Sequence, residues 1–376
     1  MKVVTVANVP PNKMGSFEKY LRDHSYHLLK SGFSHTIFLP NKPIPEVCTS
    51  LESEGAKVVV FENLHKNDLR ARWKLYREIL KEQPTVLHTH FIHILGPLSF
   101  LMLFNKVKFF ATYHISGALA NSNWLVRFYK RLRWLMLGSS YDGIFCVSEY
   151  TKKKFVNNYG AFRHNVSVVY NAINQSEFGE YRDKYSTRSF SGDKLIRLVT
   201  VSALIPDKGI QYLIEACSQL SSRSIDYQLH IIGEGPYRKN LEELVKIYGI
   251  NEEVHFLGSR NDVPNLLMNG DIMIVPSIWQ EAFGFTILEA MSIGVPLIVT
   301  NVGAIPELVE NNFNGLVVEK ESADQISEAV IKLTESPKLR KNFSDRGISI
   351  SNTRFSIDNQ CEKLIFLYGV SKKNSG

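Results

Sequence analysis

The sequence predicts an α/β protein with two Rossmann-like domains facing a cleft, and three observations support this fold class. A chain of 376 residues is long enough for two domains of about 150 residues each. Short apolar or β-branched runs alternate with longer helical patterns throughout the chain, which is typical of parallel sheets built from βαβ units. Polar residues 181–194 interrupt this alternation near its middle and indicate a linker.

Runs with the length and composition of strands are separated by segments such as Leu241–Tyr248, in which apolar residues recur at helical steps. The first half holds Val3–Ala7, Thr36–Leu39, Val58–Phe61, Val86–His88, Phe109–Tyr113, Ile144–Val147 and Val166–Tyr170. The second half holds Leu198–Val201, Gln228–Ile232, Val254–Leu257, Ile272–Val275, Leu297–Val299 and Leu316–Val318. We expect domains at 1–180 and 195–350, and a C-terminal helix within 351–376 that returns to the first domain.

Charge is distributed unevenly along the chain. The formal net charge is 44 − 37 = +7, but residues 1–180 carry 23 − 13 = +10 and residues 181–376 carry 21 − 24 = −3. This asymmetry indicates that only the first domain meets an anionic surface or ligand.

Two other features restrict the class of protein. The four cysteines lie far apart without metal-binding spacing, which argues against a disulfide framework or a zinc site. The N-terminal apolar run is too short for a signal peptide. The longest apolar stretch, Ile94–Phe104, is shorter than the roughly 18 residues that span a bilayer. We therefore expect a soluble or peripheral protein on the cytoplasmic side.

The strongest chemical signal follows the predicted strand Ile272–Val275. Glu281 precedes a predicted helix and Glu289 lies near the same helical face about two turns later. Backbone N–H groups at residues 283–285 would be unpaired donors at the helix start, which suit an anion, while carboxylates accept hydrogen bonds from hydroxyl groups. The arrangement suits a sugar attached to a diphosphate. Alternatively, Glu281 caps the helix and Glu289 faces solvent.

This block, continued through Gly294-Val295-Pro296 and Gly303-Ala304-Ile305-Pro306-Glu307, resembles the donor-site signature of retaining glycosyltransferases of family 4. Further motifs in matching order extend the resemblance over nearly the whole chain. They are Pro11–Glu18, His88-Thr89-His90, Thr112-Tyr113-His114, Val147-Ser148-Glu149, Tyr170–Ile173, Leu204–Gly209 and Ile232–Pro236.

The resemblance implies a GT-B fold and transfer of a sugar from a nucleotide-sugar with retention of configuration. It implies that Glu289 holds the ribose, that Glu281 and the backbone at 283–284 hold the donor sugar, and that Lys208 neutralises the diphosphate. His114 would lie near the sugar from the other domain, and Gly15 would let the backbone approach. We expect the catalytic residues to be His114, Lys208 and Glu281. The expected donor-binding residues are Gly15, Ala203, Lys208, Gly233, Arg260, Glu281, Phe283, Gly284, Phe285 and Glu289.

Two positions depart from the family pattern. Ala203 stands where the family usually has an arginine, and we expect Arg260 to supply the second cation unless turnover is weakened. Ser16 replaces the second glycine of the first loop, and would be strained if position 16 required a positive φ.

Weaker sequence signals restrict which ligands the site is expected to bind. Gly233-Glu234-Gly235 lacks the third glycine of a dinucleotide fingerprint, since Arg238 stands there, so nicotinamide binding is not expected. The chain has no Asp-x-Asp, which predicts a site without a metal ion. No cofactor is expected, because a nucleotide-sugar would be a substrate. His88 and His90 share one strand face and are interpreted as cleft or core residues. A strand-end histidine such as His114 is more often structural, and only the resemblance favours a functional role.

A basic aromatic segment lies in the first half. Residues 83–141 contain six Lys and Arg, two tryptophans and no Asp or Glu. Residues 124–136 read as an amphipathic helix with Leu125, Phe128, Leu132 and Met136 on one face. We expect the other face to contact an anionic membrane through Trp124, Arg127, Lys130, Arg131 and Trp134. The alternative is an ordinary helix that packs its apolar face on the sheet. No nucleic-acid-binding module is present, so nucleic acid is not an expected partner.

These observations predict a retaining, metal-independent hexosyltransferase that extends a glycan or lipid-linked acceptor in cell-surface polysaccharide synthesis, for example of lipopolysaccharide. We expect it at the inner face of the cell membrane. Two alternatives stay open: a GT-B nucleotide-sugar epimerase, and a non-catalytic subunit that binds sugar nucleotides.

Overall fold

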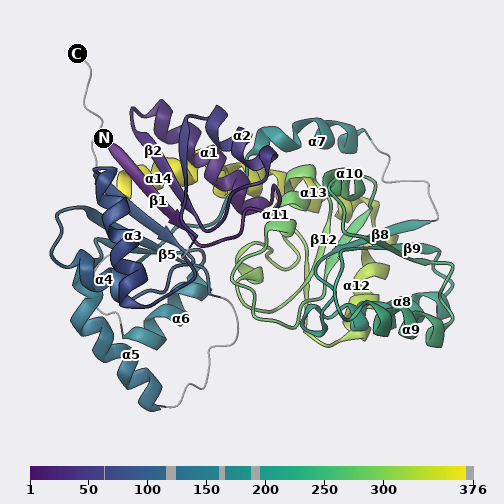
Figure 1. Cartoon of the computed structure of the whole chain (residues 1–376). Coiled ribbons are helices and arrows are strands. Elements are labelled where there is room, and N and C mark those ends of the chain that lie inside the picture. Colours follow the sequence, from purple (N-terminus) through teal and green to yellow (C-terminus); the bar gives the residue numbers. More distant parts are fainter. Residues whose placement is uncertain (63, 116–123, 161–165, 188–194, 370–376) are drawn as a thin grey trace. The chain divides into compact units, whose positions relative to one another are not determined.

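A computed structural model describes residues 1–62, 64–115, 124–160, 166–187 and 195–369 (Figure 1). Each of the strand runs predicted from the sequence forms a strand. They are β1 Lys2–Ala7, β2 Ser34–Leu39, β3 Ala56–Val60, β4 Val86–His90, β5 Lys108–Tyr113, β6 Gly143–Cys146, β7 Val166–Val168, β8 Ile196–Val201, β9 Tyr227–Ile232, β10 Val254–Gly258, β11 Ile272–Val275, β12 Leu297–Thr300 and β13 Leu316–Val318.

Helices connect the strands. The α-helices are α1 Ser16–Lys30, α2 Pro45–Ser53, α3 Leu69–Lys81, α4 Pro97–Met102, α5 Trp124–Leu137, α6 Glu149–Tyr159, α7 Gly179–Ser186, α8 Ile210–Ser222, α9 Arg238–Tyr248, α10 Val263–Met268, α11 Phe285–Ile293, α12 Ala323–Glu335, α13 Pro337–Arg354 and α14 Ile357–Leu367. Short 3-10 turns are η1 Gly138–Ser140, η2 Gln175–Phe178, η3 Pro206–Lys208 and η4 Ile305–Glu307.

The strands form two parallel sheets, which confirms the predicted fold class. The first has the order β3-β2-β1-β4-β5-β6-β7 and the second β10-β9-β8-β11-β12-β13. In both sheets the strand order reverses once, between β1 and β4 in the first and between β8 and β11 in the second. Two units therefore share one doubly wound architecture, in which crossover helices cover both faces.

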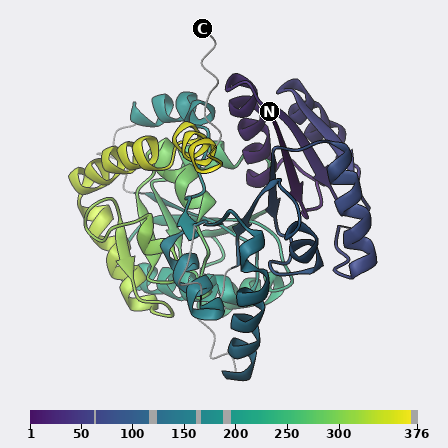
Figure 2. The same ribbon diagram turned by 90° about the vertical axis from the view of Figure 1, so that its left-hand side faces the viewer.

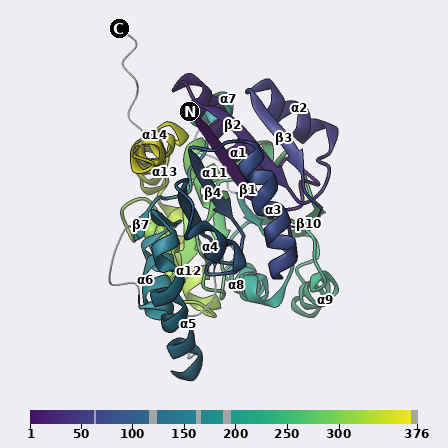
Figure 3. The same ribbon diagram turned by 60° about the vertical axis from the view of Figure 1, so that its left-hand side comes forward.

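Of the described residues, those within 1–115, 124–172 and 357–369 form the first unit. Strand β1 shows how its core is made, because successive side chains enter opposite faces. Val3 joins a cluster with residues of α1, α2 and α14, while Val4 joins one with residues of α3, α4 and α6. Helices α1 and α14 pack against each other, and α3 lies along one side of the sheet in Figures 2 and 3.

Of the described residues, those within 173–356 form the second unit. Its main core cluster joins α8, α9 and α12 to the strands. One detail of the predicted boundary is wrong: the expected linker at 181–194 begins inside α7, where buried Tyr185 anchors a short helix of otherwise polar sequence. The C-terminal helix α14 belongs to the first unit. None of the described helices is both long enough and apolar enough to cross a bilayer.

Candidate active site

Most predicted site residues lie at the carboxyl edges of the two sheets, next to the points where strand order reverses. Lys208 follows β8 and Glu281 follows β11, the two strands on either side of the reversal in the second sheet. In the first sheet, Gly15 follows β1, while His90 ends β4. Open α/β sheets bind ligands at such positions, so the sequence motifs and the topology indicate the same edges.

The turn that carries Lys208 is bound to the loop after β11 by main-chain hydrogen bonds. The carbonyl oxygen of Asp207 accepts from the N–H groups of Ile278 (2.9 Å) and Trp279 (3.0 Å). Gly209 closes the turn at φ +69°, where a Cβ atom would lie 1.9 Å from the carbonyl oxygen of Pro276. Only glycine fits this close approach. Gly209 therefore fixes the position of the Lys208 backbone, from which the side chain extends.

Lys208 and Glu281 form an ion pair. The Nζ atom of Lys208 lies 2.5 Å from Oε1 of Glu281, and the hydroxyl of Ser277 donates to the same oxygen at 2.9 Å. Both charged side chains retain partial exposure, while Ser277 is buried. The carboxylate is thus held in one orientation beside a cation, as a site for a ligand with both hydroxyl and phosphate groups requires.

The sequence analysis did not predict three residues of this cluster as site residues, although it quoted Gly303 within a motif. Besides Ser277, Gln280 accepts from the backbone N–H of Gly303 at 2.7 Å through its side-chain oxygen. Gly303 has φ +56°, and a Cβ there would lie 2.3 Å from the carbonyl oxygen of Glu281. The signal was present, because Ser277 and Gln280 lie in the loop after β11 and Gly303 lies in the quoted family signature.

The start of α11 differs from the expectation in one respect. Because the helix begins at Phe285, Glu281 lies four residues outside it and shares no helical face with Glu289. Gly284 is the N-cap and offers no side chain to the first turn. Phe283 is buried and packs on Phe285, with ring centroids 5.9 Å apart. The helix start is therefore fixed by a buried aromatic residue, and its first N–H groups follow Gly284.

Three other predicted residues of the second unit, Ala203, Gly233 and Arg260, follow strands at the same edge of the sheet. No hydrogen bond or ion pair connects these three described residues. Ala203 follows β8 and is exposed, and Gly233 follows β9 directly. The guanidinium of Arg260 pairs with Asp262 through two hydrogen bonds of 2.8 Å, and Asp262 raises the arginine pKa. Arg260 as the second cation stays a prediction, and it requires this pair to open.

In the first unit, the loop after β1 leads directly into α1. Gly15 is the N-cap, and its backbone N–H donates to Glu18 at 3.1 Å. Ser16 is the first helical residue and is not among the described residues with positive φ. The strain considered for Ser16 is therefore absent, because helix geometry suits any L-residue there.

His114 is part of a cluster of imidazole rings. Its Nε2 atom lies 3.1 Å from Nδ1 of His90, and its ring stacks on Phe91 with centroids 4.1 Å apart. Burial lowers the His114 pKa to about 3, so the ring is neutral. His88 and His90 do share one face, with centroids 4.2 Å apart, and both are core residues.

The cluster extends to side chains that the sequence analysis did not single out. His88 is held between the Tyr368 hydroxyl (2.8 Å) and Thr112 (2.7 Å). His35 is held between Thr5 (2.7 Å) and Ser25 (2.8 Å). Burial holds the pKa of both histidines well below the usual value. Their positions in separate strands and helices explain why spacing could not reveal the cluster.

Helix α5 presents its apolar side outward. None of its residues is buried, and Phe128, Leu135 and Met136 expose 62%, 79% and 63% of their surface. In Figures 1 and 3 the helix extends away from the rest of its sheet. The alternative in which the apolar face packs on the sheet is therefore wrong.

Two residues of the predicted membrane face, Trp134 and Lys130, lie on the side of α5 that packs on the unit. Trp134 packs edge-on against Phe155, with centroids 5.3 Å apart, and contacts Tyr159. It therefore anchors α5 to the unit. Lys130 lies over the Tyr159 ring on the same side, whereas Trp124, Arg127 and Arg131 are exposed. Helical spacing identified the two faces of α5, but it did not show which face packs on the rest of the unit.

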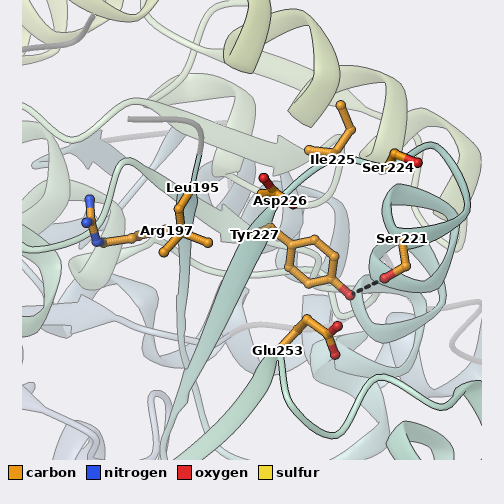
Figure 4. A pocket seen from close by; sticks show the side chains of 8 residues that line it. All are labelled: Leu195, Arg197, Ser221, Ser224, Ile225, Asp226, Tyr227 and Glu253. Carbon is orange, nitrogen blue, oxygen red and sulfur yellow. Dashed lines mark hydrogen bonds between the residues drawn. The ribbon is translucent and has the colours of Figure 1, made fainter. Parts of the chain in front are cut away.

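A pocket of about 570 Å³ lies elsewhere in the second unit (Figure 4). Its lining includes Arg197 near the start of β8, Tyr227 at the start of β9, and Glu253 just before β10. These are the amino ends of the strands, opposite the edge of Lys208 and Glu281, and none of the predicted site residues lines it. Within the described ranges, no three His, Cys, Asp or Glu side chains are grouped to hold a metal ion.

Comparison with known proteins identifies related sequences. Alpha-D-kanosaminyltransferase of Streptomyces kanamyceticus is 29% identical over 199 residues, which are 52% of this chain and 50% of that protein. The chain thus spans about half the length of this relative. The UDP-Gal:alpha-D-GlcNAc-diphosphoundecaprenol alpha-1,3-galactosyltransferase of Escherichia coli is 24% identical and aligns over 80% of this chain and 79% of its own length.

Solved structures with the same fold cover the whole chain. A glycosyltransferase from Rickettsia africae has a TM-score of 0.81 at 21% identity, over 100% of this chain and 99% of that one. Anabaena HepE in complex with UDP-glucose has a TM-score of 0.75 at 18% identity, over 98% and 99%. Residues 17–177 match Glycosyltransferase Family 4 and residues 182–349 match Glycosyl transferases group 1. The chain belongs to the family 4, group 1 glycosyltransferases.

Proposed function

We propose that the protein transfers a hexosyl group from a nucleotide-sugar to a glycan or lipid-linked acceptor, with retention of configuration and without a metal ion, in cell-surface polysaccharide synthesis. The observation that carries the proposal is the Lys208–Glu281 pair at the carboxyl edge of β8 and β11. A cation and a carboxylate beside a helix start suit the two ends of one ligand, a diphosphate and a sugar.

The chemistry follows from where charge develops. When the bond between the anomeric carbon and the phosphate oxygen breaks, the nucleoside diphosphate leaves with the electron pair. The acceptor hydroxyl oxygen bonds to the same carbon, and its proton passes to the departing diphosphate. Lys208 would stabilise the negative charge on that oxygen, and a fixed charge of this kind contributes about 10²–10³-fold to kcat. Glu281, oriented by Ser277, would hold sugar hydroxyls.

Names of similar proteins support the two substrate classes. HepE was solved with UDP-glucose, which supports a nucleotide-sugar donor. The Escherichia coli relative acts on a diphosphoundecaprenol-linked sugar, which supports a lipid-linked acceptor.

We propose that α5 is the segment that binds the membrane, placing the protein at the inner face of the cell membrane. An outward apolar face that includes Phe128 and Leu135 lies beside exposed Arg127 and Arg131. Large exposed apolar side chains mark interaction surfaces. Residues 83–141 contain no acidic side chain, so an anionic lipid surface complements their charge.

The transferase proposal is tested by following nucleotide release and product formation from UDP-, GDP- and ADP-sugars with a membrane extract as acceptor source. We expect slow donor hydrolysis or transfer that falls about 10²–10³-fold in Lys208→Ala, and much less in Lys208→Arg. Glu281→Ala should abolish the reaction. Conversion of the donor to an isomer without transfer would indicate the epimerase, and donor binding without turnover would indicate the non-catalytic subunit.

The membrane proposal is tested by flotation with vesicles of phosphatidylcholine alone or with phosphatidylglycerol. Phe128→Glu combined with Leu135→Glu should abolish binding to the anionic vesicles, and charge reversal at Arg127 and Arg131 should weaken it. Ile247→Glu is the matched control, because Ile247 is 76% exposed on α9 of the other unit. Flotation that is unchanged in the α5 variants would contradict the proposal.

A further inference from the structure

The contact between His90 and His114 has a direction that the surroundings of His90 determine. The two rings share one hydrogen bond, between Nδ1 of His90 and Nε2 of His114. His90 is 1% exposed, and its other nitrogen, Nε2, is buried without a hydrogen-bond partner. Burial holds the His90 pKa well below its usual value. Each ring is therefore neutral and carries one N–H group.

Two arrangements of the protons satisfy this geometry. If His114 donated from Nε2, the proton of His90 would have to be on its own Nε2, which would leave a buried N–H without an acceptor. If His90 donates from Nδ1, its Nε2 is only an unused acceptor. Orphaned buried N–H groups are much rarer than under-satisfied acceptors in native structures, so the second arrangement is favoured.

We propose that His90 is a positioning residue that donates to His114 and thereby fixes the proton of His114 on Nδ1. His114 then presents a neutral N–H donor, which suits an oxygen of a bound sugar and cannot serve as a base. The last step rests on the proposed function, whereas the direction of the hydrogen bond does not.

Aromatic packing holds the imidazole ring of His114 in place. Phe91 adopts a left-handed backbone (φ +56°), which is uncommon for a bulky residue, and its ring stacks on His114 at an interplanar angle of 15°. Phe17, near the start of α1, meets the same imidazole edge-on with centroids 6.0 Å apart. Ring orientation is thus fixed by packing, and the hydrogen bond from His90 has only to select the tautomer.

The direct test is the ¹⁵N spectrum of the histidine side chains in the full-length protein, with His114 assigned through His114→Gln. We expect a protonated Nδ1 and a bare Nε2 at His114. In His90→Leu the proton of His114 should move toward Nε2, the tautomer preferred by free histidine in water. A wild-type His114 that carries its proton on Nε2 would overturn the inference.

Kinetics supply the second test. The side-chain amide of His90→Asn places a donor where Nδ1 of histidine lies, while His90→Gln places its amide near Nε2. We expect kcat/KM to fall about tenfold in His90→Leu and His90→Gln, and to recover in His90→Asn. Equal losses in all three folded variants would refute the positioning role. An inactive wild type with the expected spectrum would contradict the proposed function but leave the hydrogen-bond direction standing.

Discussion

Replacing His24 by phenylalanine should make the protein less sensitive to acid. His24 is fully buried in α1 and stacks on Tyr20, with ring centroids 5.5 Å apart. Neither of its ring nitrogens has a hydrogen-bond partner. Burial lowers its pKa to about 3, against about 6.5 in an unfolded chain.

The magnitude follows from proton linkage. Between pH 6.5 and pH 3 the unfolded state binds a proton that the folded state excludes, so stability falls as the pH falls. Each pH unit below 6.5 removes about 1.4 kcal/mol, and His24 alone therefore removes about 2 kcal/mol of unfolding free energy at pH 5. His35, His88 and His90 have pKa values shifted in the same direction. Each of these three buried rings therefore adds to the loss of stability in acid.

Urea unfolding at pH 7.5 and pH 5 measures this effect, with hydrogen exchange to locate the transition in the first unit. The stability difference between His24→Phe and wild type should grow by about 2 kcal/mol in favour of the variant on going to pH 5. Any change in packing is the same at both pH values and cancels. His65→Phe, at an exposed histidine, should show no such growth. A pH-independent difference for His24→Phe would refute the reasoning.

Three further outcomes test the site of the second unit. Gly209→Ala should weaken donor binding in a calorimetric titration, since its Cβ would collide with Pro276 and displace the turn of Lys208; unchanged affinity would contradict the close approach. Ser277→Ala should lower kcat/KM about tenfold or more through loss of a buried hydrogen bond to a carboxylate, whereas Ser202→Ala, at a partly exposed serine, should not. Turnover should stay within about twofold in EDTA; a loss restored by Mg²⁺ or Mn²⁺ would exclude a metal-independent reaction.

Periodicity predicted the fold because both sheets are parallel and buried. Their strands are rich in apolar residues and lie between amphipathic helices, and each predicted run became a strand. The error at the linker has a local cause. Helix α7 buries only Tyr185, so it has no apolar repeat to detect, although it contacts α10 and α11.

The site was predictable where chemistry follows a strand in sequence, and unpredictable where it depends on contacts between strands. Lys208 and Glu281 each lie just beyond a strand, so motif and topology agree. The hydrogen bond between His90 and His114 depends on β4 and β5 being neighbours, and Tyr368 reaches His88 only because α14 packs on α1. The apolar face of α5 points outward because Trp134, on the other side, packs on the unit. Sequence spacing cannot show whether a tryptophan packs in this way or is exposed.

The histidine cluster links the stability of the first unit to its proposed chemistry. Apolar side chains at positions 24, 88 and 90 would fill the same space without an acid-dependent loss of stability, so polarity in this core must be explained by something other than packing. His88 is satisfied by two hydroxyls, whereas His90 leaves one nitrogen unused and directs the other at His114. An unsatisfied buried nitrogen lowers stability. In the arrangement that we propose, the cost at His90 accompanies a hydrogen bond that keeps the proton of His114 on Nδ1. Among the buried rings that make the first unit acid-sensitive, His90 is therefore the one to which the proposed hydrogen bond gives a role beyond packing.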